Sequence, residues 1–214
     1  MKALLVKSFS VLILIVPAVL APQAMASAAS GKVAVLNIRG HLVNAVFSDT
    51  DPAGCLRTDV FVTADSGTEQ DLPSTQTFAL AAVSIYRYDS CTNTTLLDAT
   101  GSNDTLPAGD FQVLAQLDKA SLATTFTVSD LVSSSSFEVN VNVGWTGTSD
   151  IFRNHSNTNE IYPGCHIINR WKGSGRDAVA SGVVSDGVTN FTPGTSQYAE
   201  IGFVNDGFEI IGCA

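Results

Sequence analysis

The sequence predicts an all-β protein: an antiparallel β-sandwich or jelly roll of about ten strands that follows a cleaved signal peptide. Apolar residues recur at every second position through most of the chain, which is the period of a strand with one buried face. Turn-forming residues separate these segments, and after residue 26 no stretch has the 3.6-residue apolar period of an amphipathic helix. No helices are therefore expected to cover a parallel sheet.

The alternation is clearest at 137–145, where apolar residues are separated by Glu138, Asn140, Asn142 and Gly144. This pattern places one side of the strand in a core and the other in water. Similar alternation predicts further strands at 33–47, 55–63, 77–88, 111–117, 122–128, 166–172, 178–184, 198–204 and 208–212.

Turn residues lie between most of these segments. Asp186-Gly187 and Asp206-Gly207 are typical of hairpin turns, since Gly adopts positive φ readily. The second of these predicts a hairpin between 198–204 and 208–212. Ser133 to Ser136 predicts a short hairpin loop, and 147–164 predicts a long polar loop.

The first 26 residues have the three parts of a secretory signal peptide. Lys2 and Lys7 supply the positive start, an apolar run follows from Phe9 to Leu20, and Ala24-Met25-Ala26 forms an A-x-A cleavage site. An uncleaved anchor is the alternative, but the run is shorter than the roughly 20 residues that span a bilayer. We therefore expect a secreted, extracellular protein with one domain over 27–214 and no membrane insertion of the mature chain. Two small sandwiches divided near Ser133 are the alternative.

The chain is acidic. Its net charge is −9, and loss of Lys2 and Lys7 with the leader would remove two positive charges and make it −11. Nucleic acids and anionic membranes select basic surfaces. The composition therefore predicts no nucleic-acid partner, and it leaves an extracellular glycan or protein as the expected partner.

An exported chain with an even number of cysteines is expected to form disulfides. The four cysteines are Cys55, Cys91, Cys165 and Cys213, which allow three pairings. We favour Cys55–Cys91 with Cys165–Cys213, because each bridge then lies within one half of the chain. A zinc site is the alternative, but it would need close pairs such as C-x₂-C, which the sequence lacks.

The segment 147–164 is the longest interruption between predicted strands and is dense in polar side chains. Long loops in compact domains are often functional, and otherwise they are exposed connections. Aromatic rings stack on sugars, although a single aromatic residue usually belongs to the core. The candidate binding residues are Arg153, His155, Glu160, Tyr162 and Trp171.

Calcium is the one cofactor that the sequence suggests. Asp49 and Asp51 lie two residues apart in a predicted turn, and carboxylates on loops suit this hard cation. The alternative is that these aspartates cap the backbone of their own turn.

No catalytic residue is predicted. The G-x-S-x-G motif of many serine hydrolases is absent after the leader. A glycosidase needs two positioned carboxylates. Glu138 and Glu200 lie in predicted strands, at alternating positions that are typical of solvated faces.

Segments 55–62, 146–148 and 181–193 resemble stretches of uncharacterised secreted bacterial all-β proteins. The resemblance extends over most of the chain after the leader. It implies export and a bacterial source, and it assigns no activity and no catalytic residue.

These observations predict a secreted, non-enzymatic binding module, extracellular or associated with the cell surface, for a carbohydrate or a protein. The alternative is a secreted hydrolase that acts on polysaccharide, with its site on a concave sheet face or in the 147–164 loop. A third hypothesis is a structural, matrix-like protein, which should have long unpaired strand edges.

Overall fold

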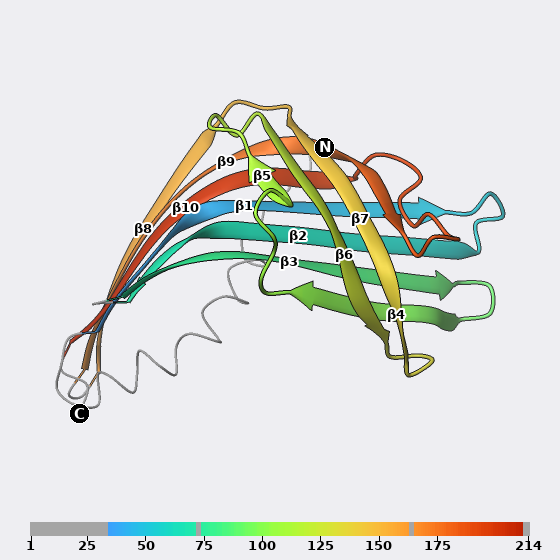
Figure 1. The fold of residues 1–214 in the computed structure, drawn as a ribbon, viewed down its shortest axis with the longest axis horizontal. Coiled ribbons are helices and arrows are strands. Elements are labelled where there is room, and N and C mark those ends of the chain that lie inside the picture. The colour runs from blue at the N-terminus through green and yellow to red at the C-terminus, as the bar shows by residue number, and fades with distance from the viewer. Residues whose placement is uncertain (1–33, 72–73, 163–164, 212–214) are drawn as a thin grey trace, which may run out of the picture.

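The structure is a computed structural model that describes residues 34–71, 74–162 and 165–211. Over these residues the fold is all-β, and its ten antiparallel strands belong to one sheet (Figure 1). The predicted all-β class and the number of about ten antiparallel strands are therefore confirmed, and the strands form a single sheet in which β9 pairs with both β7 and β10. No helix in the described part of the chain is long and apolar enough to cross a bilayer.

The strands differ widely in length. In chain order they are β1 (Ala34–Thr50), β2 (Leu56–Asp71), β3 (Ser74–Asp89), β4 (Thr94–Asn103), β5 (Phe111–Val113), β6 (Lys119–Asp130), β7 (Ser135–Gly147), β8 (Phe152–Tyr162), β9 (Cys165–Ser185) and β10 (Tyr198–Ile211).

Most of the strands close into a ring. The pairings run β10–β1–β2–β3–β4–β6–β7–β9, and β9 pairs again with β10. The length of β9 makes this closure possible, because residues 166–177 pair with β10 and residues 178–185 pair with β7. The weakest seam is between β4 and β6, where only Ala99↔Asp130 and Thr100↔Ser129 are paired among the described residues. β5 is added to β6 and β8 to β9.

The core lies inside this ring. The alternation predicted for 137–145 is confirmed, since Val139, Val141, Val143 and Trp145 are at most 2% exposed. The indole Nε1 of Trp145 donates a hydrogen bond to the carbonyl oxygen of Asn44 at 2.7 Å. The N–H, which is the one polar group of this buried indole, therefore has a hydrogen-bond partner.

Five strands of the ring continue beyond it and, together with β8, form a sheet that we call the sheet extension. It comprises 34–42 of β1, 65–71 of β2, 74–80 of β3, 152–162 of β8, 166–176 of β9 and 201–211 of β10. In Figure 1 these strands curve away together toward the lower left. Gly40 and Gly67 face each other where the extension begins. A Cβ at these positions would lie 2.4 Å and 2.2 Å from the carbonyl oxygens of Ser66 and Arg39, so only glycine permits this approach.

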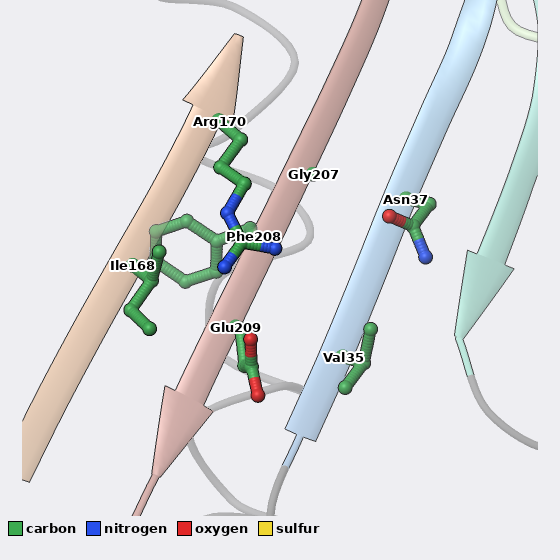
Figure 2. A pocket seen from close by; sticks show the side chains of 7 residues that line it. All are labelled: Val35, Asn37, Ile168, Arg170, Gly207, Phe208 and Glu209. Carbon is green, nitrogen blue, oxygen red and sulfur yellow. The ribbon is translucent and has the colours of Figure 1, made fainter. Parts of the chain in front are cut away.

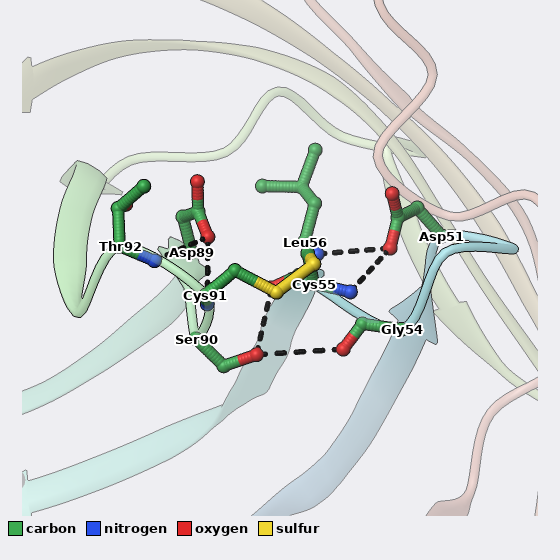
Figure 3. The surroundings of a disulfide bond; sticks show 8 residues. All are labelled: Asp51, Gly54, Cys55, Leu56, Asp89, Ser90, Cys91 and Thr92. Carbon is green, nitrogen blue, oxygen red and sulfur yellow. Dashed lines mark hydrogen bonds between the residues drawn. A yellow bond between two sulfur atoms is a disulfide. The ribbon is translucent and has the colours of Figure 1, made fainter.

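A disulfide joins Cys55 and Cys91 at the open end of the β2–β3 hairpin (Figure 3). The backbone N–H of Ser90 also donates to the carbonyl of Cys55 at 2.8 Å. This predicted bridge is confirmed. The predicted partner of Cys165 is Cys213, which lies outside the described residues.

Two predicted interruptions are wrong. Asp206-Gly207 is not a turn, because β10 runs through it and Gly207 pairs with Asn37 on one side and Arg170 on the other. The predicted 147–164 loop is largely strand β8. The predicted turn at Asp186-Gly187 is confirmed: Gly187 has φ 89°, and Asp186 Oδ1 accepts the N–H groups of Val188 and Thr189.

Candidate functional site: the basic face of the sheet extension

The two faces of the sheet extension differ in charge. Residues directly opposite in an antiparallel ladder share a face and successive residues alternate, so the registers assign each side chain. What we call the basic face continues the core-lining side of β1 and holds Arg39, His41, Arg153, His155, His166, Arg170 and Lys172. What we call the acidic face holds Asp65, Glu69, Asp71, Glu160 and Asp206. Among the described residues of the extension, the basic face has one carboxylate, Glu209, and the acidic face has no Lys or Arg.

The basic face is open to solvent. Arg39, Arg153, Arg170 and Lys172 are all exposed. Asn205 of β10 pairs with Arg39 of β1 on one side and with Lys172 of β9 on the other. The backbones of Lys172 and Arg39 are therefore two strand spacings, roughly 10 Å, apart. Arg170 follows two residues from Lys172, roughly 7 Å along β9. Between these cations the face presents side-chain amides and hydroxyls, at Asn37, Thr68, Gln70, Thr77, Asn157 and Asn205.

Phe203 organises the end of the basic face nearest the core. The Arg39 guanidinium lies over its ring, with Cζ 5.4 Å from the centroid, and the His41 ring contacts it edge-on at 5.2 Å. Burial, and secondarily the charge of Arg39, lowers the pKa of His41 below its ordinary value. His41 is therefore neutral at neutral pH, and the positive charge at this position comes from Arg39.

A shallow hollow of about 70 Å³ lies on the basic face at Gly207 (Figure 2). Gly207 forms its floor, because no side chain rises between Asn37 on β1 and Arg170 on β9. A Cβ at this position would lie 3.1 Å from Asn37 Oδ1. Arg170 extends across β10, and Glu209 lies on the same side (Figure 2). The hollow therefore offers a guanidinium donor, an amide and a carboxylate acceptor around an open floor.

The acidic face is also the more apolar of the two. Trp171 and Phe152 cover glycines there: a Cβ at Gly173 would come within 2.5 Å of the indole, and one at Gly175 within 2.5 Å of the phenyl ring. These aromatic side chains occupy space that a side chain at either glycine would fill. Trp171 and Phe152 therefore cover the backbone of the sheet at these glycines, and this structural role explains their positions.

Carboxylates on the acidic face lie in partly apolar surroundings. Burial raises the pKa of Asp65 to about 7 from its ordinary 3.8, and burial also raises the pKa of Asp206. The pKa of Glu69 is raised by burial and then by the nearby charge of Asp71. Within the described part of the chain, Asp206 Oδ1 is buried without a hydrogen-bond partner. This face therefore carries less negative charge at mildly acidic pH than at neutral pH.

The structure separates the predicted binding residues. Arg153 and His155 lie on the basic face of β8, whereas Glu160 and Trp171 lie on the acidic face. The side chain of Tyr162 is outside the described residues. Arg153 and His155 thus join the basic face, and the other two described residues belong to the opposite surface.

Sequence reasoning missed Arg39, Arg170 and Lys172 as members of one surface. Arg170 and Lys172 stand two residues apart in a predicted strand, so their shared face was available from the alternation alone. Arg39 also lies in a predicted strand, but its place beside Lys172 depends on the pairing of β10 with both β1 and β9. No sequence signal specifies that pairing.

The calcium candidates occupy the β1–β2 turn. Asp51 Oδ1 accepts the backbone N–H groups of Cys55 at 2.8 Å and Leu56 at 2.9 Å, so this carboxylate caps its own turn (Figure 3). Asp49 is exposed at the end of β1. Calcium binding stays a prediction. The one group of three potential metal ligands found among the described residues includes both sulfurs of the Cys55–Cys91 disulfide, with Asp89.

The two carboxylates weighed for a hydrolase lie in different environments. Glu138 is exposed on β7, as predicted. Glu200 is only 6% exposed, contrary to the solvated position predicted for it, and it accepts a hydrogen bond from the Tyr198 hydroxyl at 2.7 Å. Burial and this interaction raise the pKa of Tyr198. Glu200 also faces Asp177 across β9–β10, so a carboxylate pair exists, with one member held by a tyrosine.

The geometry is thus that of an exposed cationic sheet face, with a small hollow, on an otherwise acidic protein. Comparison with protein-family models, with curated proteins and with solved structures finds no match to this chain.

Proposed function

We propose that this protein is a secreted, non-enzymatic binding module that holds an acidic polysaccharide on the basic face of the sheet extension. The observation that carries this proposal is the segregation of charge. In a chain of net charge −9, Arg39, Arg153, Arg170 and Lys172 gather on one exposed face of the sheet extension, and the carboxylates of the extension, apart from Glu209, lie on the other. A polyanion would be repelled by most of the surface and attracted to this face.

The neutral side chains of the basic face suit a sugar ligand. Amides and hydroxyls between the cations can exchange hydrogen bonds with sugar hydroxyls, and the hollow at Gly207 leaves room for part of a ring. Arginine binds carboxylate and sulfate groups through paired N–H donors. A glycan that carries such groups would therefore use both kinds of side chain.

A single-stranded nucleic acid is also a polyanion, and the basic face fits it less well. Such ligands rely on bases that stack on exposed aromatic rings. Phe203, the aromatic side chain that the registers place on this face, is only partly exposed and is covered by Arg39 and His41. Secretion, supported by the leader segment and consistent with the Cys55–Cys91 disulfide, favours a glycan further.

The test measures binding of the protein without its leader to polygalacturonate, dextran sulfate, neutral dextran and a single-stranded oligonucleotide. We expect binding to an acidic glycan that weakens as salt is added, and none to neutral dextran. Replacing Arg170 and Lys172 together with glutamine should weaken binding by at least about tenfold.

The matched control replaces Arg57 and Lys119 with glutamine. These exposed cations lie outside the sheet extension, and their loss changes the net charge equally. Equal weakening in both double variants would mean that net charge, not the basic face, governs binding. Tighter binding of the oligonucleotide than of either acidic glycan would overturn the choice of ligand class.

A further inference from the structure

We infer that two copies of this protein pair through their β8 strands, in antiparallel fashion and about a two-fold axis at Asn157. β8 is an edge strand. It pairs with β9 from Phe152 to Tyr162, and no other strand among the described residues pairs with its outer side. Because backbone groups alternate in direction along a strand, a row of N–H and C=O groups points outward from this edge.

In its own sequence and ladder, β8 lacks the usual features that prevent strand pairing. β8 contains no proline, and its pairing with β9 runs without a register shift over its whole length. It is 11 residues long, which is long for an edge strand. β8 carries one carboxylate, Glu160, and one guanidinium, Arg153. These two side chains lie near opposite ends of the strand and on opposite faces.

The sequence of β8 is self-complementary in one register. With the axis at Asn157, Arg153 faces Ile161, Asn154 faces Glu160, His155 faces Asn159, and Ser156 faces Thr158 of the second copy. No like charges stand opposite each other, and polar residues face polar residues from 154 to 160.

The other edge of the extension fits a second copy less well, and its Ala79 carbonyl already accepts the backbone N–H of Leu106 at 2.9 Å. Residues 74–80 of β3 form a shorter edge, and symmetric pairing about Thr77 would set Gln76 against Phe78 and Ser74 against Leu80. We therefore assign the contact to β8.

Pairing at β8 would join the two basic faces. Directly opposite residues in an antiparallel pair share a face, so Arg153 and His155 of both copies would lie on one side of a continuous sheet. This inference rests on the strand edge and does not depend on the ligand proposed above.

The first test is a cross-link. In Asn157→Cys the two new thiols face each other across the axis, within the Cα separation that a disulfide requires. In the matched control, Asn159→Cys, the thiols are roughly 13 Å apart along the strands. We expect mild oxidation to give a covalent dimer in the first variant and much less in the second. More efficient cross-linking of the Asn159 variant would overturn the proposed register.

The second test is sedimentation velocity over a dilution series. The unmodified protein should show a monomer–dimer equilibrium, and Asn157→Lys should weaken it by about tenfold, because two lysines then meet at the axis. Thr77→Lys, at the other edge, should leave the dimer intact. A monomer at every concentration would refute the inference, as would growth beyond the dimer or dissociation by Thr77→Lys alone. Circular dichroism checks that each variant is folded.

Discussion

At the scale of single residues, Asp65 shows how the acidic face responds to pH. It lies between Leu42 of β1 and Leu80 of β3, and burial raises its pKa to about 7. The folded protein therefore holds this proton more tightly than the unfolded chain does. Its effect on stability becomes more favourable as pH falls from about 7 towards 4, and above pH 7 the ionised carboxylate is destabilising.

We predict that Asp65→Asn increases the free energy of unfolding at pH 8 by about 1–2 kcal/mol. The gain should disappear near pH 4, where the wild-type carboxyl is already neutral. Urea unfolding at both pH values measures this. Asp104→Asn, in an exposed loop, is the control and should change little at either pH. A gain that is equal at pH 4 and pH 8 would contradict the assigned cause.

Trp171 makes a second point at this scale. Its indole covers Gly173 on the acidic face, while its neighbours Arg170 and Lys172 point to the basic face. From the sequence alone, a tryptophan between two cationic residues suggests a ligand-binding site. The strand period divides the three residues between opposite surfaces.

At the scale of elements, the β2–β3 hairpin depends on its disulfide. The bridge links residues 36 apart and closes the end where Leu56 pairs with Asp89. We predict that replacing Cys55 and Cys91 together with serine lowers the free energy of unfolding by about 4 kcal/mol, because the unfolded chain regains the freedom of this loop.

Urea unfolding of the double serine variant measures this loss. Non-reducing peptide mapping of the unmodified protein should recover the two cysteines in one linked peptide pair. Recovery of Cys55 linked to Cys165 or Cys213 would contradict the assignment.

At the scale of the whole molecule, the ring and the sheet extension differ in what stabilises them. Inside the ring, Val43 and Ala45 of β1 are fully buried, whereas Arg39 of the same strand is exposed. Strand pairing without a core is weakly protected. The two parts of one strand should therefore open with different free energies.

We predict that amides in 43–47 exchange with solvent much more slowly than those in 34–40, and that β8 is the least protected strand. Hydrogen exchange followed by mass spectrometry, at concentrations where the protein is monomeric, measures this. Uniform protection along β1 would show instead that the ring and the extension unfold as one unit.

The sequence by itself determined the all-β class and the apolar stripe that becomes the core of β7, and it favoured the Cys55–Cys91 disulfide among three possible pairings. These follow from local alternation and from cysteine spacing, which need no knowledge of pairing. It predicted ten strands, but 166–172 and 178–184 merge into β9, and 198–204 and 208–212 merge into β10. The total is still ten because the structure adds two strands that were not predicted, β4 and β8.

Only the tertiary structure decided the rest. β8 has polar residues on both faces because it is an exposed edge, so its sequence carries no apolar alternation. Glycines at 173, 175 and 207 suggest breaks, yet the strands pass through them because neighbouring side chains occupy the space above the backbone or leave it as a hollow. The basic face exists because β10 pairs with both β1 and β9, which places Arg39 and Lys172 on the same face, on either side of Asn205. Such long-range pairing depends on the whole sheet, and the local sequence around Arg39 or Lys172 does not specify it.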